Sequence, residues 1–553
     1  MLGRPTMDGG RLVRKGRGVV RRAAGAVGRL HPGALYRAYE LRRWRERSER
    51  VLAGFTKAGA SDAGGRVLVD AMWDNPNYWI RYALFRAAVG CGGRHDVGVL
   101  GPYRASEGRR TLARLGITEA VQLLDLRGDQ QAHRREARRL LAQTRTPVDI
   151  LGWHLPHDLP ADFVYDGILK RQRSAAVDLG DPRLEEYVAE ALGSIAAAQT
   201  LLASDRFELL LMSHAVNFQF AALAWIAVSR GIPVVLLYGN YGVPRFAKLL
   251  DAADMYDTTD RPKAADLAAL PAAKAQTLAA VGQAYLDRRR RGHTDDIGAR
   301  YAFQRASARV TRSALLETFG WDPDHPMVGV YAPNWFDFPH PCGMTQFRDF
   351  LDWIEATLSV AARQRRVNWL FKAHPCDQWY GGVTLSDLMP PLDGHRHMRL
   401  VPTDWNGSAL LDAVDGVVTY HGTVGVEAAS AGKPVLVADR GWYHDAGFVK
   451  WPRSREEYLD ALATDWWKDL DLDATARLAR IFSGWYFGRP VWQDNFVLDD
   501  DTLQAPIYRR VPDRFAASPD AVAREVRTIG EWFASDSRHY HTFKMGRTDE
   551  FTG

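Results

Sequence analysis

The stretch from Asp415 to Asp439, DGVVTYHGTVGVEAASAGKPVLVAD, constrains the fold of this chain more than any other. Val417–Tyr420 is a short apolar run, Val424–Ala431 has helical spacing, and Gly432-Lys433-Pro434 stops that helix before a second apolar run, Val435–Ala438. The pattern predicts a strand, a helix and a second strand joined by short turns. Because such a crossover joins parallel strands, the sequence favours an α/β fold.

The turn His421-Gly422-Thr423 is predicted to bind an anion. It lies at the carboxyl end of a strand and the amino end of a helix, where unpaired backbone N–H groups and the helix dipole favour negative charge. We expect this ligand to be a phosphate. The alternative is an ordinary structural crossover, which is common in α/β proteins.

A second strand end places a cation and an imidazole at the same edge. Val367–Phe371 is typical of a strand, and it runs into Lys372-Ala373-His374-Pro375. Open α/β sheets bind ligands at the carboxyl ends of their strands. We therefore expect these groups to lie close to the turn.

From Val328 to Leu462 the chain resembles the bacterial capsule polysaccharide biosynthesis transferases. The motifs VGVYAPNWFDFPH, FKAHP and LVPTDWNGSALLDAVDGVVTYHGTVGVEAASAGKPVLVAD occur in the expected order. Those proteins are glycosyltransferases with two Rossmann-like lobes, the GT-B fold. The Gly-x-x-x-x-Glu-Ala run followed by Gly-Lys-Pro-Val is also similar to nucleotide-sugar 2-epimerases, which share that fold.

The resemblance implies roles for the residues of both strand ends. The His-Pro pair and the small-residue turn would hold the nucleotide phosphate, and Glu427 would accept hydrogen bonds from ribose or donor hydroxyls. Glu427 is expected to be a carboxylate at the surface of the cleft, which contributes little to folding. His421 stands where a serine is often found. The expected donor and phosphate site consists of Lys372, His374, Pro375, His421, Gly422, Thr423 and Glu427. The resembled class generally needs no catalytic metal, so we expect neither a metal nor a cofactor.

Three residues are candidates for the general base, or for its counterpart in a retaining reaction. Asp74 follows the first predicted strand, His214 follows the buried run Phe207–Met212, and Asp337 lies in the loop after the strand Met327–Tyr331. For His214 the alternative is a packed or capping role, because a lone histidine is more often structural.

Four further residues are expected to border a cleft between the lobes. Prolines at 333, 339 and 341 forbid a regular helix, so the loop after the strand Met327–Tyr331 presents polar side chains rigidly. Two other loops of this edge begin after Val401 and after Asp439, and the second offers aromatic rings for stacking on a base or sugar. The residues are Asn334, His340, Asp404 and Tyr443. The alternative is that these are structural turns and interface aromatics.

At 553 residues the chain exceeds the roughly 250–300 residues that one hydrophobic core supports, so two lobes are expected. Strand-like runs at Arg66–Met72, Asp96–Leu100, Val121–Leu124 and Pro147–Leu151, separated by helical stretches, predict a first Rossmann-like lobe. Residues 262–318 are rich in Ala, Arg and Lys and have no strand signals, so they are predicted to form helices that carry the chain from the first lobe to the second. The charge run Arg288–Arg291 is interpreted as a solvated helix face rather than a phosphate site. The resemblance implies that C-terminal helices cross back to the first lobe. The predicted divisions are a basic helical N-terminal extension 1–60, an N-terminal acceptor lobe 61–315, a C-terminal nucleotide-donor lobe 316–490 and a C-terminal helical extension 491–553.

The basic charge is concentrated at the N-terminus. Residues 1–50 hold 14 lysines and arginines against four acidic residues, a net +10, whereas the whole chain carries +6. Apolar residues interleave with these arginines, which favours an amphipathic element on an anionic membrane surface over a nucleic-acid arm. The alternative is a solvated tail. Three scattered cysteines and no apolar run of about 18 residues predict a cytoplasmic protein, peripheral at most on the inner face of the cell membrane.

The resemblance implies a glycosyltransferase that moves a sugar from a nucleotide-activated donor to a growing capsular or other surface polysaccharide or a glycolipid. The His-Pro motif suggests CMP-linked acidic sugars, while UDP- and GDP-sugars stay open. One alternative is another enzyme of this fold, either a nucleotide-sugar 2-epimerase or a transferase of polyol phosphate from a CDP-alditol. A non-catalytic assembly partner is the other.

Overall fold

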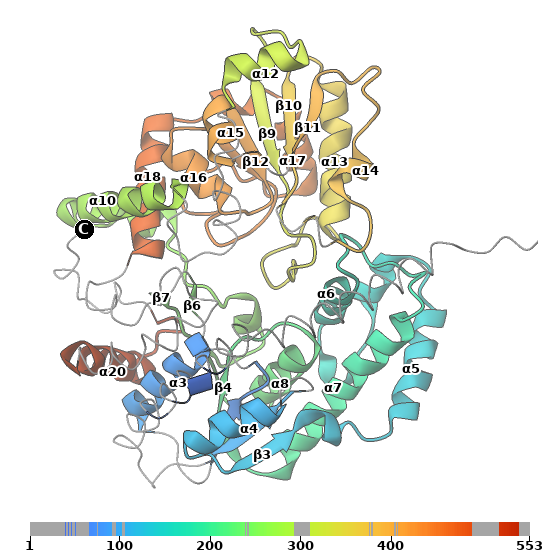
Figure 1. Cartoon of the computed structure of the whole chain (residues 1–553), viewed down its shortest axis with the longest axis vertical. Helices are drawn as coiled ribbons and strands as arrows, with labels where there is room; N and C mark the ends of the chain where they lie inside the picture. Colours follow the sequence, from blue (N-terminus) through green and yellow to red (C-terminus); the bar gives the residue numbers. More distant parts are fainter. Residues whose placement is uncertain are drawn as a thin grey trace, which may run out of the picture.

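The computed structural model contains two separate α/β layers, which form the lower and upper halves of Figure 1. We call the half built on strands β1 to β8 the first lobe and the half built on β9 to β13 the second lobe. The structure describes residues 66–73, 76–90, 96–101, 105–237, 239–240, 243–291, 310–374, 377, 380–402, 405, 407–488 and 519–540, together with 39, 42, 43, 46 and 50. The predicted N-terminal extension therefore lies almost entirely outside the described residues.

The first lobe contains a six-stranded sheet in the order β3-β2-β1-β4-β5-β8. All neighbouring strands pair in parallel except β8, which runs antiparallel to β5. A two-stranded ribbon, β6–β7, lies between β5 and β8 in sequence. The strands are β1 Arg66–Asp70, β2 Val97–Leu100, β3 Glu119–Gln122, β4 Phe207–Met212, β5 Val234–Leu236, β6 Gly239–Asn240, β7 Val243–Pro244 and β8 Ala247–Leu249.

Both faces of this sheet are covered, because side chains alternate along each strand. Leu68 and Leu210 belong to one apolar core, which α5, α6, α7 and α8 complete, while Val69 and Leu211 belong to a second core with α3 and α4. The helices are α3 Pro76–Val89, α4 Ala105–Arg114, α5 Gln130–Ala142, α6 Ala161–Gln172, α7 Leu184–Ser204 and α8 Phe218–Ser229. The expected strands at 66–72 and 96–100 are confirmed.

The predicted strand at Pro147–Leu151 is wrong. These residues form a 3-10 helix, η2 Pro147–Gly152, in which proline occupies the first position. The Asp149 carboxylate accepts a hydrogen bond from the Thr146 backbone N–H at 2.8 Å and completes a capping box. Local capping chemistry therefore overrides the apolar alternation. Val121–Leu124 is strand only as far as Gln122.

The second lobe contains five strands that are all parallel, in the order β11-β10-β9-β12-β13. The crossover predicted between Asp415 and Asp439 is confirmed as β12, α16 and β13. The elements are β9 Met327–Tyr331, α13 Phe350–Arg363, β10 Asn368–Lys372, α14 Leu385–Leu388, β11 Met398–Val401, α15 Gly407–Ala413, β12 Gly416–Thr419, α16 Val424–Ser430, β13 Val435–Val437 and α17 Arg455–Leu462.

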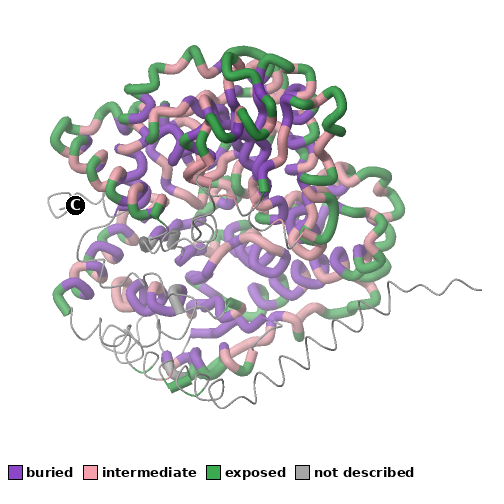
Figure 2. Tube along the Cα trace, turned by 45° about the horizontal axis from the view of Figure 1, so that its top comes forward, coloured by how far each residue is buried: buried purple, intermediate pink, exposed green. Residues whose placement is uncertain are grey.

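Helices connect the lobes in both directions. After the first lobe come α9 Ala264–Ala268, α10 Ala272–Arg290 and α12 Arg312–Phe319. They confirm the helices predicted for 262–318 except at 292–309, which lie outside the described residues. Helix α10 packs along α18 Leu472–Phe487 beside the second lobe (Figure 1). Buried residues fill the interiors of both lobes, and exposed residues lie on the outer surfaces (Figure 2).

The C-terminal part of the chain returns to the first lobe, as the resemblance implied. Helix α20 Pro519–Ala534 packs on α3, and Ile529 and Trp532 are fully buried in the core there. Beyond the helix, the backbone N–H of Tyr540 donates to the carbonyl of Phe246 at 2.9 Å. Among the described residues, no helix combines the length and apolar character needed to span a bilayer.

Candidate functional site

The loop after β9, residues 332–349, reaches from the second lobe to helix α6 of the first (Figure 1). The Asp166 carboxylate on α6 is fully buried and accepts hydrogen bonds from the backbone N–H of His340 at 3.0 Å and from its Nδ1 at 2.6 Å. The Tyr165 hydroxyl donates to Asp349 at 2.6 Å. Burial alone would lower the pKa of His340, but the charge and hydrogen bond of Asp166 outweigh it and raise that pKa. Burial raises the pKa of Asp166 as well, against the charge and hydrogen bonds of His340, so the lobes are joined by a buried, hydrogen-bonded carboxyl–imidazole pair.

A second, more exposed contact joins the lobes beside the first. The Lys170 ammonium pairs with the Asp337 carboxylate at 3.0 Å, and it lies over the rings of Phe336 and Phe338 at 5.0 and 5.1 Å. The Asp337 side chain is 59% exposed. Asp337, a predicted candidate for the base, and His340, predicted at the cleft, therefore lie at the lobe junction, and their roles toward a ligand stay predictions.

Electrostatic interactions extend this junction into both lobes. Burial lowers the pKa of His214 to about 4, and the positive charge of Lys170 adds to the effect. On the second lobe burial lowers the pKa of His421, with Asp337 among the charges that oppose it. The charge of Lys170 thus affects the pKa of His214 in the first lobe, and the charge of Asp337 affects the pKa of His421 in the second.

At the first-lobe sheet edge, the ends of β1 and β4 form a buried hydrogen-bonded group. The Asp70 carboxylate is fully buried and accepts from the Ser213 hydroxyl at 2.6 Å, the Ser213 backbone N–H at 3.0 Å and the Met72 backbone N–H at 2.7 Å. Ser213 Oγ also lies 2.8 Å from Nδ1 of His214. Burial raises the pKa of Asp70 to about 6, against those hydrogen bonds. Sequence reasoning proposed His214 but missed its partner Ser213 and the Asp70 carboxylate to which Ser213 donates.

Aromatic rings enclose His214 on two sides. Its ring lies 4.0 Å from that of Phe220 and meets the indole of Trp73 edge-on at 5.5 Å between centroids. Trp73 is 46% exposed. Asn217, which caps α8, has φ of 73°, so the short connection from β4 turns sharply here. His214 is therefore held rigidly at the surface of the first-lobe edge.

On the second lobe, β10 ends in the predicted Lys-x-His sequence. Lys372 is buried, and its Nζ donates to the Trp405 carbonyl at 3.0 Å. His374 is half-buried two residues later, and its carbonyl accepts from the backbone N–H of Asp377 at 2.9 Å. Lys372 is thus the last residue of β10 and His374 lies two residues beyond it, at the same sheet edge as the end of β12.

The predicted phosphate turn, His421-Gly422-Thr423, follows β12 and is braced from two directions. The Trp442 indole N–H donates to the His421 carbonyl at 3.2 Å, and the Tyr443 hydroxyl donates to the Gly422 carbonyl at 2.7 Å. The Gly422 backbone N–H donates to Thr419 Oγ1 at 3.3 Å. The shape of this turn is fixed by side chains that follow β13.

These contacts correct the predicted stacking role of Tyr443. The ring is 1% exposed and packs against Phe448 and Phe482, with centroids 5.6 and 6.4 Å apart. A Cβ added at Gly425 would lie 2.2 Å from the Tyr443 hydroxyl, so glycine is needed for tyrosine to reach the turn. Tyr443 supports the turn from inside and does not present a face to a ligand.

Glu427 also differs from expectation. It is 6% exposed, and its carboxylate pairs with the guanidinium of Arg289 on α10, which is 4% exposed. The expectation of a surface carboxylate with little effect on folding is wrong, because both charges are buried. The solvated helix face predicted at 288–291 is likewise wrong for Arg289. Burial, together with the charge of Glu427, raises the pKa values of Tyr331 and Tyr443.

Asp439, two residues after the end of β13, is a second buried acid that sequence reasoning did not single out. Its fully buried carboxylate accepts hydrogen bonds from the Thr345 backbone N–H and hydroxyl at 2.6 and 2.8 Å, the Gln346 backbone N–H at 2.7 Å and the Tyr420 hydroxyl at 2.7 Å. It ties the loop after β9 to the ends of β12 and β13. The sequence does contain a signal for such buried acids, because Asp70 ends the apolar run VLVD and Asp439 ends the apolar run VLVAD.

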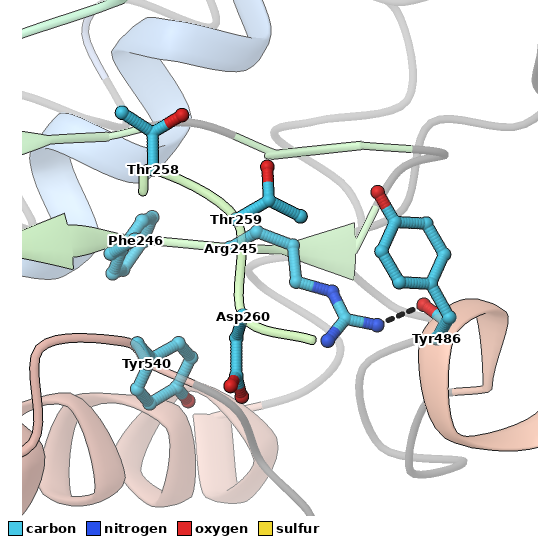
Figure 3. Close-up of a pocket in the computed structure, with 7 residues that line it drawn as sticks. All are labelled: Arg245, Phe246, Thr258, Thr259, Asp260, Tyr486 and Tyr540. Carbon is cyan, nitrogen blue, oxygen red and sulfur yellow. Dashed lines mark hydrogen bonds between the residues drawn. The ribbon is translucent and has the colours of Figure 1, made fainter. Parts of the chain in front are cut away.

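A small cavity lies where Arg245 of the first lobe meets Tyr486 at the end of α18 (Figure 3). The buried guanidinium donates to the Tyr486 carbonyl, while its Nε and Nη1 have no hydrogen-bond partner within the described part of the chain. Burial lowers its pKa to about 10. Asp260, Thr258, Thr259, Phe246 and Tyr540 complete the lining. The volume of about 10 Å³ fits about one water, so this cavity is too small for a nucleotide.

The remaining predicted residues are divided by what the structure describes. Asp74, Pro375 and Asp404 lie outside the described residues. Asn334 is half-buried in the loop after β9, and its Oδ1 has no hydrogen-bond partner among described residues. Within the described ranges, no group of three His, Cys, Asp or Glu side chains is arranged to hold a metal ion.

Comparison with solved structures gives distant similarities. HepE from Anabaena, solved in complex with UDP, is 12% identical, covers 83% of this chain and all of its own, and has a TM-score of 0.28. The UDP-GlcNAc 2-epimerase from Neisseria meningitidis is 11% identical over 76% of this chain and 96% of its own (TM-score 0.25). The glycosyltransferase SnogD from Streptomyces nogalater is 12% identical over 76% and 96% (TM-score 0.24).

A comparison with curated protein sequences found no match. A comparison with protein families found one for the second lobe. The matching segment begins in the loop after β9, ends in α17, and contains β10, the phosphate turn and α16. Residues 345–460 match the family described as capsule polysaccharide biosynthesis protein, which confirms for this part of the chain the resemblance that its motifs indicated.

Proposed function

We propose that this protein is a glycosyltransferase of capsule or surface polysaccharide synthesis, with the nucleotide-activated donor bound by the second lobe. One observation carries the proposal. The segment that matches the capsule family, 345–460, is also the one that brings Lys372, His374 and the phosphate turn to one sheet edge. Ligands of open α/β sheets bind at that edge.

The second lobe supplies the electrostatic part of the reaction. When the bond between the sugar and the phosphate breaks, negative charge develops on the leaving nucleotide. The positive charge of Lys372, the imidazole of His374 and the backbone of the turn stabilise that charge without reorganising. The bracing of the turn by Trp442 and Tyr443 keeps it in place during the reaction.

The first lobe supplies the base. In a direct displacement the acceptor hydroxyl loses its proton to His214 as its oxygen forms a bond to the sugar carbon. The sugar–phosphate bond breaks, and its electron pair leaves with the nucleotide. Burial and the charge of Lys170 hold the pKa of His214 near 4, so the imidazole is unprotonated at neutral pH. Asp337 and Asp74 are the other candidates for this role.

The substrates are proposed in finer detail from the sequence motifs. The donor is a nucleotide-linked hexose or acidic sugar, with a CMP-linked acidic sugar suggested by the His-Pro pair, and transfer needs no metal or cofactor. The acceptor is a polysaccharide or a lipid-linked glycan. The basic N-terminal arm then places a cytoplasmic enzyme on the inner face of the membrane, with each basic residue near the surface contributing about 1 kcal/mol.

A nucleotide-sugar 2-epimerase is the alternative, because the run from Gly422 to Glu427 is similar in those enzymes. The two functions differ in what they require. An epimerase converts its nucleotide sugar alone, whereas a transferase releases nucleotide only when an acceptor is present. Product analysis with and without acceptor distinguishes them.

The test begins with thermal shifts in CMP, CDP, UDP, GDP and dTDP. A nucleotide at about 100 times its Kd stabilises the folded protein by about 2.7 kcal/mol. Turnover is then measured with the sugar of the nucleotide that stabilises best. We expect His374→Ala to lower turnover on the order of 10²-fold, because it removes a preorganised group from the developing charge.

The matched control is His395→Ala. His395 lies before β11, at the opposite end of the same sheet, and its ring is hydrogen-bonded to the Pro391 carbonyl through Nδ1 at 3.1 Å. Its loss should leave turnover unchanged. Equal activity of both variants, or no stabilisation by any nucleotide, contradicts the proposed function.

A further inference from the structure

Asp70, Ser213 and His214 form a chain of hydrogen bonds at the first-lobe edge, and its directions are fixed by chemistry. Asp70, with a pKa of about 6, is ionised at neutral pH and can only accept hydrogen bonds. It lies 2.6 Å from Ser213 Oγ, so the single hydroxyl proton of Ser213 points at Asp70. Ser213 Oγ therefore has only lone pairs left for His214.

This order selects the tautomer of His214. Nδ1 lies 2.8 Å from Ser213 Oγ, and a hydrogen bond between them requires the proton to be on Nδ1. A neutral imidazole has one N–H, so Nε2 carries a lone pair. The described residues offer Nε2 no hydrogen-bond partner, and the ring is only half-buried. Nε2 is thus available as a proton acceptor.

The surroundings of His214 suit a sugar. A single exposed aromatic ring needs no explanation of its own, but Trp73 meets the His214 ring at 5.5 Å and is 46% exposed. An indole offers an apolar face to the C–H groups of a sugar, next to a nitrogen that accepts from its hydroxyl. Lys170, whose charge lowers the pKa of His214, pairs with Asp337 of the second lobe, so this place lies near the lobe junction.

Resting on the proposed function, we propose that Trp73 and His214 form the subsite for the acceptor sugar, and that Asp70 and Ser213 are positioning residues that keep His214 in the Nδ1–H form. The acceptor hydroxyl gives its proton to Nε2 as its oxygen bonds to the donor carbon. The resulting imidazolium keeps its Nδ1–H bond to Ser213, and the charge of Asp70 stabilises it through that hydroxyl.

The first measurement needs no substrate. Nitrogen-15 NMR of histidine-labelled full-length protein at neutral pH, with His214 assigned by comparison with His214→Gln, shows which ring nitrogen carries the proton. We expect Nδ1–H in the wild type and in Ser213→Thr, which keeps the hydroxyl. Ser213→Ala should give a mixture of tautomers. An Nε2–H form in the wild type overturns the proposal.

The second measurement separates positioning from folding. Ser213→Ala should lower kcat by about 10-fold or more with the donor KM unchanged, since a correctly held base contributes on the order of 10²–10⁴, and Ser213→Thr should restore much of it. Trp73→Ala should raise the KM for acceptor only. Ser194→Ala is the control, because it removes another buried serine hydroxyl, bonded to the Glu190 carbonyl at 2.7 Å. It should change neither constant.

The outcomes distinguish this inference from the proposed function. If the wild type transfers no sugar from any donor, the proposed function fails whatever the tautomer. If it transfers sugar and Ser213→Ala behaves like Ser194→Ala, the positioning role is wrong while the function stands. An unchanged acceptor KM in Trp73→Ala removes the indole from the subsite and overturns that part of the proposal.

Discussion

Replacing Glu427 by glutamine should destabilise the second lobe far more than a surface substitution. Glu427 is 6% exposed and pairs with Arg289, which is 4% exposed. Glutamine keeps the shape but leaves the guanidinium buried without a countercharge. Removing one member of a buried ion pair typically costs 3–5 kcal/mol, whereas an exposed pair contributes about 0–1 kcal/mol. We expect a loss of about 3 kcal/mol.

Hydrogen exchange in increasing urea measures this loss locally, in peptides that cover β12 and α16. A loss of about 3 kcal/mol corresponds to exchange more than about 100-fold faster, since every 1.4 kcal/mol is tenfold. The control is Asp412→Asn, which breaks the exposed pair with Arg290 on the same helix α10. The double variant Glu427→Gln with Arg289→Met should recover part of the loss, because no buried charge remains.

A loss below about 1 kcal/mol, or one equal to that of Asp412→Asn, refutes this reasoning. The measured loss of stability also decides how weaker donor binding by Glu427→Gln is interpreted. If the helix after the turn is destabilised as expected, weaker nucleotide binding follows from loss of the turn, and a direct contact of Glu427 with ribose is not needed to explain it.

Three further outcomes are expected. Burial raises the pKa of Asp70 from 3.8 to about 6 in the folded state, so the free energy of unfolding falls as pH rises between those values, by about 3 kcal/mol in all. In Asp70→Asn this part of the pH dependence should vanish, as urea unfolding from pH 4 to 7 will show. The pKa of His340 is raised beside Asp166, so this pair stabilises the lobe junction fully below the ordinary histidine pKa, and the stabilisation is lost as pH rises through the raised value. Hydrogen exchange in the loop after β9, corrected for the intrinsic effect of pH, should therefore become faster at alkaline pH in the wild type. His340→Gln should abolish this dependence. Gly425→Ala should cost about 1–3 kcal/mol by overpacking, partly recovered with Tyr443→Phe, as thermal unfolding of both variants will show.

The second-lobe fold was predictable because its signals are local. Apolar runs of four to five residues, interrupted by Gly432 and Pro434, give β12, α16 and β13 within one or two residues of the expected ends. The strand end at Lys372 was found the same way. Where a local signal competed with another, as at Pro147, the cap prevailed over the alternation.

The site was only partly predictable, because its supporting contacts join residues far apart in sequence. Arg289 pairs with Glu427 across 138 positions, and Asp70 accepts from Ser213 across 143. No local sequence pattern around either residue of these pairs predicts its partner. The sequence identified His214 by its place at a strand end, whereas the tautomer that makes it a base depends on a contact that only the folded sheet creates.

The most direct test of the account is a calorimetric titration of the best-stabilising nucleotide into three proteins: wild type, His374→Ala on the second lobe and His214→Ala on the first. We expect His374→Ala to weaken binding by about tenfold or more, equal to about 1.4 kcal/mol. His214→Ala should leave nucleotide affinity unchanged and abolish transfer. Wild-type affinity in His374→Ala, or loss of nucleotide affinity in His214→Ala, would contradict a donor site on the second lobe.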